Sequence, residues 1–176
     1  SLDNDQYVIF EHLGNGGSAT EETEWANYRF GEGKGIMLWG EIFYPYKQLA
    51  QGYSTGADIS SIGHLSRGYS GKRLMGYPES HDKDRLMYEA VTYGNGAGAY
   101  PVNGNLTNAL NRMASLGAIS ILVPGPKMIW HFQELGMDDS IYTCNNGSVN
   151  SESDAIPGDC KLDTKPQPQW TENWIS

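Results

Sequence analysis

The chain alternates between short apolar runs and longer stretches in which apolar residues recur at helical spacing. Four of the runs are rich in β-branched and aromatic residues and are bounded by polar or turn-forming residues, which is typical of buried strands. These predicted strands cover residues 6–10, 35–40, 73–77 and 127–132. We therefore expect four strands, separated by helical segments.

The segments between these runs predict helices. The clearest one follows Asn105, whose side chain is of the type that caps a helix, and it is ended by Pro124. Shorter helices are expected over residues 20–28, 42–53 and 57–65, and after Asp82 as far as Gly94. This alternation of strands and helices predicts an α/β fold with a parallel sheet.

The 176 residues are enough to form a single segment with a hydrophobic core. Within this segment, residues 137–176 are expected to form a polar, loop-rich tail. Because the chain starts at Ser1 without a methionine, we expect a processed or excised piece of a longer protein. Cys144 and Cys160 both lie in the tail, where they either pair or remain thiols. A cytoplasmic and an extracytoplasmic location both stay open.

Charge and composition exclude some classes of partner. The net charge of −9, with no basic patch, argues against nucleic-acid binding. No apolar run approaches the roughly 18 residues of a membrane-spanning helix, and no basic amphipathic helix predicts a membrane surface. The abundance of Gly, Tyr and Trp suits neutral, hydroxyl-rich ligands such as sugars.

No cofactor is predicted from the sequence. The acidic residues of the tail lack the fixed ligand spacing of a calcium loop, so a solvated loop is the simpler interpretation. These acidic residues are Asp138, Asp139, Asp154 and Asp159. Calcium in a longer parent protein stays open.

Candidate chemistry is densest in residues 77–86, which hold three acids, a histidine and an arginine. Asp82 of this segment follows the third predicted strand, Glu11 directly follows the first, and Glu134 follows the fourth. Because the carboxyl ends of parallel strands share one edge, these acids are expected at the functional edge of the sheet. The alternative is that Glu11 ends a strand in solvent and the other acids complement a helix dipole.

Three segments match known motifs in their order and spacing: Tyr-Val-Ile-Phe-Glu at 7–11, Gly-Tyr-Pro-Glu-Ser-His-Asp at 76–82, and residues 124–136. They resemble the fifth, seventh and eighth barrel strands of the α-amylase family of glycoside hydrolases, family thirteen. Gln133 stands where the family usually has glycine, and Ser80 where many relatives have asparagine. The resemblance implies half of a (β/α)8 TIM barrel, with parallel strands five to eight and flanking helices.

The resemblance also implies a role for each candidate residue. Glu11 would be the general acid/base, which protonates the glycosidic oxygen and later activates water. Asp82 would stabilise the transition state by holding sugar hydroxyls, with help from His81. Arg85 would orient these carboxylates by ion pairing, or alternatively form an ordinary salt bridge on a helix surface. His12 would line the leaving-group side.

The family's nucleophile, an aspartate in an Arg-x-Asp motif on the fourth strand, has no counterpart, since only ten residues precede Glu11. Retaining glycosidases need a nucleophile and an acid/base about 5–5.5 Å apart. We therefore expect a parent that hydrolyses α-glucans and a segment that is inactive alone. The edges of a half barrel predict self-association, or a partner that supplies the missing N-terminal half.

Three other interpretations stay open. A transglycosylating or branching enzyme of the same family uses the same residues. A non-catalytic carbohydrate-binding α/β module would bind sugars through tryptophan and tyrosine alone. In an unrelated α/β interaction domain the motifs would be coincidental, and Glu11 and Asp82 would point away from each other.

Overall fold

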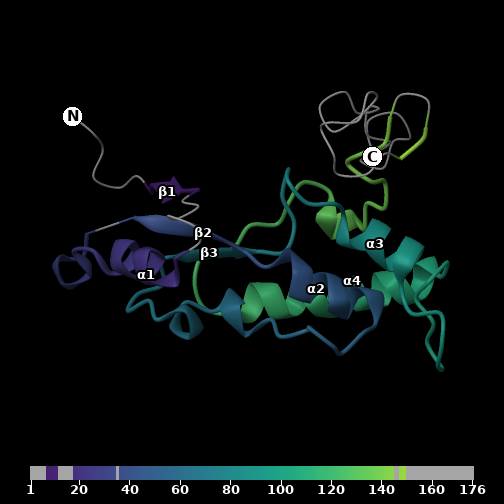
Figure 1. The fold of residues 1–176 in the computed structure, drawn as a ribbon, viewed down its shortest axis with the longest axis horizontal. Helices are drawn as coiled ribbons and strands as arrows, with labels where there is room; N and C mark the ends of the chain where they lie inside the picture. Colours follow the sequence, from purple (N-terminus) through teal and green to yellow (C-terminus); the bar gives the residue numbers. More distant parts are fainter. Residues whose placement is uncertain (1–6, 12–17, 35, 145–146, 150–176) are drawn as a thin grey trace.

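The computed structural model describes residues 7–11, 18–34, 36–144 and 147–149 of the chain. In this part the protein has an α/β fold with three parallel strands in the order β1-β2-β3 (Figure 1). The strands are β1 (Ile9–Phe10), β2 (Met37–Glu41) and β3 (Leu74–Tyr77). The predicted parallel sheet is therefore confirmed, and the order of its strands in space is their order in the sequence.

Two glycines allow the centre of the sheet to pack closely. Gly40 and Gly76 are partners across the β2–β3 pair. A Cβ atom on Gly76 would lie 2.8 Å from Cγ1 of Ile62, and one on Gly40 would overlap the side chain of Leu74. A larger residue at position 76 would press against Ile62, and one at position 40 would displace the side chain of Leu74 on the neighbouring strand.

The described residues form four α-helices: α1 (Ala19–Asn27), α2 (Phe43–Gln51), α3 (Leu86–Tyr93) and α4 (Leu106–Leu122). The predicted cap of α4 is present, because the Asn105 side chain accepts a hydrogen bond from the Asn108 amide at 3.0 Å. Helix α2 contains Pro45 in its first turn, where the missing N–H has no intrahelical acceptor to lose. These four helices confirm four of the predicted ones.

The prediction of a helix over residues 57–65 is wrong. Two short 3₁₀ turns, η2 (Ser60–Ile62) and η3 (Leu65–Arg67), stand in its place. The Asp58 side chain accepts from the Ser60 amide at 2.9 Å, and the Ser66 hydroxyl donates to the Gly63 carbonyl at 2.7 Å. Side-chain bonds of this kind compete with the helical backbone ladder.

The hydrophobic core is divided into two clusters. The larger one lies among α2, α3 and α4, which Figure 1 shows grouped at the end of the molecule away from α1, and includes Phe43, Tyr46 and Leu86. The smaller one lies between α1 and the sheet and includes Leu38 and Leu74. In the described part of the chain no helix is long and apolar enough to cross a membrane.

The predicted fourth strand and the barrel are not seen among the described residues. Lys127 forms a single parallel bridge to Gly76, and the Met128 amide donates to the Gly76 carbonyl at 3.3 Å. Pro126, just before this bridge, has no N–H to donate, and Phe132 adopts a left-handed backbone with φ 62° that leads into η4 (Gln133–Leu135). Residues 127–132 therefore lie beside the edge of β3 that faces away from β2, but they pair with it at only one point.

The tail begins as a packed segment. Met137 and Ser140 are each 1% exposed, and Tyr142 is also buried. Cys144 is buried and disulfide-bonded. Cys160 lies outside the described residues, as do Asp154 and Asp159.

Candidate functional site

The structure brings three of the predicted site residues together. The ligand-capable atoms of Glu11, His81 and Asp82 all lie within 4.8 Å of one another, and His81 Nε2 is 3.2 Å from Asp82 Oδ2. Glu11 follows β1, and the other two lie in the loop after β3, so their side chains meet across the carboxyl end of β2. All three are exposed, as a site that receives a ligand from solvent requires. We refer to Glu11, His81 and Asp82 as the acid–histidine cluster.

One end of the loop that carries His81 and Asp82 is held by a buried ion pair. Glu79 and Arg85 are 2% and 1% exposed, and Arg85 Nη1 lies 3.3 Å from Glu79 Oε2. The other Glu79 oxygen accepts from the Leu86 amide at 2.7 Å, and Arg85 also donates to the His131 carbonyl at 2.9 Å. The pair therefore connects the loop to the first turn of α3 and to the segment after Lys127.

A second buried carboxylate holds the other end of this loop. Asp84 Oδ2 accepts from the Ser140 hydroxyl at 2.7 Å, and Oδ1 accepts from the Ile141 amide at 3.0 Å and from the Arg85 amide at 2.8 Å. Exposed His81 and Asp82 thus lie between two buried acids. Because their backbone is fixed on both sides, little ordering remains to be done when a ligand binds.

Burial dominates the electrostatics of this support. It raises the pKa of Glu79 to about 7, although the Arg85 guanidinium and the Leu86 amide favour the charged form. It lowers the pKa of Arg85 and raises the pKa of Asp84, against the hydrogen bonds that Asp84 accepts. The ionised groups of the loop are therefore held in place at an electrostatic cost.

Tyr77, the last residue of β3, lies next to the acid–histidine cluster. Its pKa is raised, first by burial and then by the negative charges of Glu41, Glu11 and Asp82. The phenol therefore stays protonated at physiological pH.

Glu41 is the acidic residue near the site that the sequence did not predict. It ends β2, pairs in register with Tyr77, and its carboxylate accepts from the Phe43 amide at the start of α2. The signal that identified Glu11, an acid immediately after an apolar run, was also present here, because Glu41 directly follows the second predicted strand.

The other predicted residues are Arg85, His12 and Glu134. Arg85 pairs with Glu79 inside the protein rather than with Glu11 or Asp82. It therefore holds the loop after β3 from its buried side. A contact between Arg85 and substrate stays a prediction, and in this structure Arg85 is 1% exposed. His12 lies outside the described residues, and Glu134 is exposed in η4, apart from the acid–histidine cluster.

The acid–histidine cluster also bears on two of the interpretations that the sequence left open, a metal site and an unrelated interaction domain. Its three residues form the one group of at least three potential metal ligands among the described residues, and Asp138 and Asp139 of the tail are not part of it. Glu11 and Asp82 point toward each other, whereas an unrelated interaction domain predicted the opposite. The geometry suits hydrogen bonding to a polyhydroxylated ligand and proton transfer by Glu11.

Comparison with protein-family models gives no match to this chain, and comparison with curated proteins gives none either.

Proposed function

We propose that this chain is the C-terminal half of the catalytic barrel of a retaining α-glucan hydrolase similar to the α-amylases. The observation that carries the proposal is the meeting of Glu11, His81 and Asp82 at one edge of the sheet, although about 70 residues of sequence separate the first from the other two. These are the three residues that the resemblance assigned to acid/base catalysis and to transition-state stabilisation.

The order of the strands supports a half barrel. In a doubly wound sheet the order reverses at a switch point, whereas in a (β/α)8 barrel each strand lies beside its neighbours in sequence. Here the order is β1-β2-β3, and Lys127 bridges to the edge of β3 that faces away from β2. Residues 127–132 would complete their pairing as the last strand when the barrel closes.

The proposed chemistry assigns one role to each residue. Glu11 donates a proton to the glycosidic oxygen as the bond to the leaving group breaks, and then takes a proton from the water that attacks next. Asp82 and His81 hold hydroxyls of the sugar at the cleavage point, where their hydrogen bonds strengthen as positive charge develops on the ring. The nucleophile would come from the other half of the barrel, so the chain alone would be inactive.

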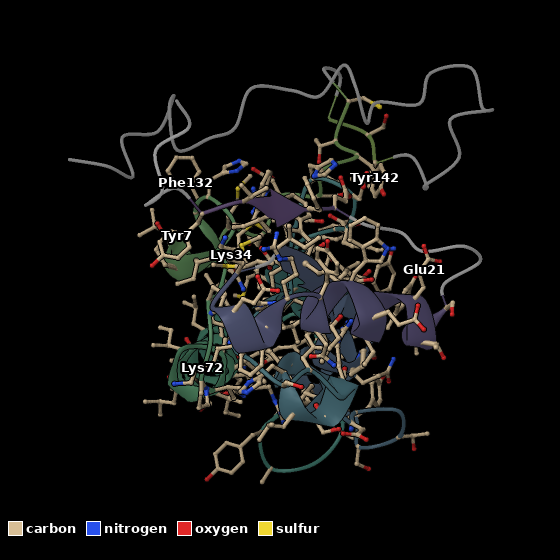
Figure 2. The ribbon with its side chains drawn as sticks, turned by 90° about the vertical axis from the view of Figure 1, so that its left-hand side faces the viewer. Tyr7, Glu21, Lys34, Lys72, Phe132 and Tyr142 are labelled. Atoms are coloured by element: carbon tan, nitrogen blue, oxygen red, sulfur yellow. The ribbon has the colours of Figure 1, made fainter. Side chains whose placement is uncertain are left out.

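The outer edge of β1 is where that other half would join. The residues of this edge are exposed hydrophobics: Tyr7 (82%), Val8 (48%), Ile9 (37%) and Phe10 (45%). Figure 2 shows Tyr7 on the outside of the molecule. Within the described part of the chain β1 pairs with β2 alone, and an open, apolar strand edge is a template for another strand. We propose that it pairs with the preceding barrel strand or, without it, with a second copy of the chain.

Calorimetric titration with maltoheptaose tests the proposed function. We expect the chain to bind this α-glucan, and Asp82→Asn to weaken binding roughly tenfold to a hundredfold, because a charge-assisted hydrogen bond contributes about 1.5–3 kcal/mol. Glu24→Gln, which removes an exposed acid on α1, is the matched control. Equal binding by the chain and the Asp82→Asn variant would contradict the proposal.

Two further measurements test the half barrel. The chain alone should release no reducing sugar from starch. Hydrolysis that is abolished by Glu11→Gln would refute the claim that the chain lacks a nucleophile. Light scattering at micromolar concentration should show self-association. A monodisperse monomer would refute the proposal that the edge of β1 pairs with another strand.

A further inference from the structure

A continuous series of aromatic rings runs along the edge of the sheet that carries the acid–histidine cluster. The ring centroids follow one another at 5.3 Å (Tyr77–Trp39), 6.2 Å (Trp39–His81), 6.1 Å (His81–Trp130), 4.8 Å (Trp130–His131) and 5.4 Å (His131–Phe132). We call these six residues the aromatic arc. It joins three segments that are remote in sequence: β2, β3 with its following loop, and the segment after Lys127.

The two tryptophans of the arc are not part of the packed interior, although Tyr77 at one end is buried. Neither hydrophobic cluster of the described residues contains Trp39 or Trp130, and both indole rings are only partly buried. Figure 2 shows Phe132, at one end of the arc, on the outside of the molecule. Large aromatic side chains that lie together at the surface indicate a binding surface more often than a core.

The arrangement of charge indicates what would bind there. His81 contacts both tryptophans of the arc and is also a member of the acid–histidine cluster, so carboxylates lie beside these rings. A pyranose offers an apolar face of C–H groups and a rim of hydroxyls, which match an indole face and a carboxylate respectively. Anionic ligands are disfavoured, because Glu11, Asp82 and Glu41 lie nearby and the chain carries a net charge of −9.

We propose that Trp39 and Trp130 are stacking surfaces for two sugar rings of a neutral glucan, one on each side of the sugar that His81 holds. This inference rests on the proposed function for the identity of the sugar and adds two residues that determine specificity. Each indole contacts His81 from a different segment, so a chain of sugars that crosses the arc would meet both.

Titration calorimetry with maltoheptaose on the variants Trp39→Ala and Trp130→Ala tests the inference. Each substitution should weaken binding tenfold or more, as expected for a tryptophan at the centre of an interface. Trp39→Phe and Trp130→Phe keep an aromatic face and should lose less, which guards against unfolding of the alanine variants. Trp25→Phe on α1, where the indole is 44% exposed and outside the arc, is the control and should leave the affinity unchanged.

The outcomes separate the inference from the proposed function. Binding that is weakened by Asp82→Asn but not by Trp39→Ala or Trp130→Ala would overturn the inference and leave the function standing. Tryptophan-dependent binding of cellohexaose as tight as that of maltoheptaose would support stacking and overturn the assignment to α-glucans. Absence of binding by any neutral oligosaccharide at millimolar concentration would overturn the inference.

Discussion

Replacing Arg85 by methionine removes the positive partner of the most buried ion pair in the described part of the chain. Methionine fills part of the same space but cannot donate to Glu79, 3.3 Å away, or to the His131 carbonyl at 2.9 Å. Glu79 would then keep only the Leu86 amide as a hydrogen-bond donor. The support beneath His81 and Asp82 would be broken at one end.

The expected loss is large because both groups are almost completely buried. Removing one partner of a buried pair typically lowers the free energy of unfolding by about 3–5 kcal/mol. For a chain of this length, 1 kcal/mol shifts the melting temperature by roughly 2–4 °C, so we expect a decrease of about 6–20 °C. In a comparable test of an exposed pair, Arg29→Met, which removes the partner of Glu32, should change stability little.

The loss should also depend on pH. Burial raises the pKa of Glu79 to about 7 while Arg85 opposes the shift, so Arg85→Met should raise that pKa further. An acid whose pKa is higher in the folded state contributes most stability below its unfolded value, near 4.5, and this contribution is lost as the pH rises. The difference between the two proteins should therefore widen above about pH 7, where Glu79 of the unmodified chain ionises.

Urea denaturation followed by circular dichroism at about pH 5.5 and about pH 8.5 measures both effects. The double variant Arg85→Met/Glu79→Gln removes both charges and should recover part of the stability lost at the higher pH. A loss below about 1 kcal/mol, or a loss that is the same at both pH values, would refute the ion pair as the support of this loop.

Three further predictions concern α4, each measured as a change in the urea midpoint. Gly117→Ala should stabilise the protein by about 0.5–1 kcal/mol, because a methyl group there meets nothing within 4 Å, and a decrease would show that the site is crowded. Asn105→Ala should cost about 1 kcal/mol by removing the acceptor of the Asn108 amide, and no change would mean that the cap is idle. Ser120→Ala should lower the free energy of unfolding by about 1–3 kcal/mol, because the hydroxyl of Tyr46, which is 0% exposed, loses its hydrogen-bond partner at 2.9 Å. An unchanged midpoint would refute a stabilising role for this hydrogen bond.

Local signals in the sequence were enough where one segment decides its own structure. The polar cap at Asn105 and the stop at Pro124 located α4, because capping and chain breaking act within a few residues. Apolar runs located β2 and β3, since a buried strand needs such a run wherever it lies in the fold. The parallel direction of the strands followed from their alternation with helices.

Tertiary structure decided what depends on neighbours. Residues 127–132 have the composition of a strand but pair with β3 at a single bridge, because the backbone turns away at Phe132 into η4 instead of following the edge of β3. The acids of the loop after β3 are alike in the sequence, yet Glu79 and Asp84 are buried supports while Asp82 is exposed. Only the three-dimensional position of Arg85 and Ser140 could separate them.

The sequence by itself singled out Glu11, His81 and Asp82 as candidate site residues. Their meeting within 4.8 Å and the aromatic arc around His81 were decided by the fold, because parallel strands bring distant segments to one edge. Helix capping acts locally along a chain, whereas a site assembled from β1, β2 and β3 depends on contacts that no single segment encodes.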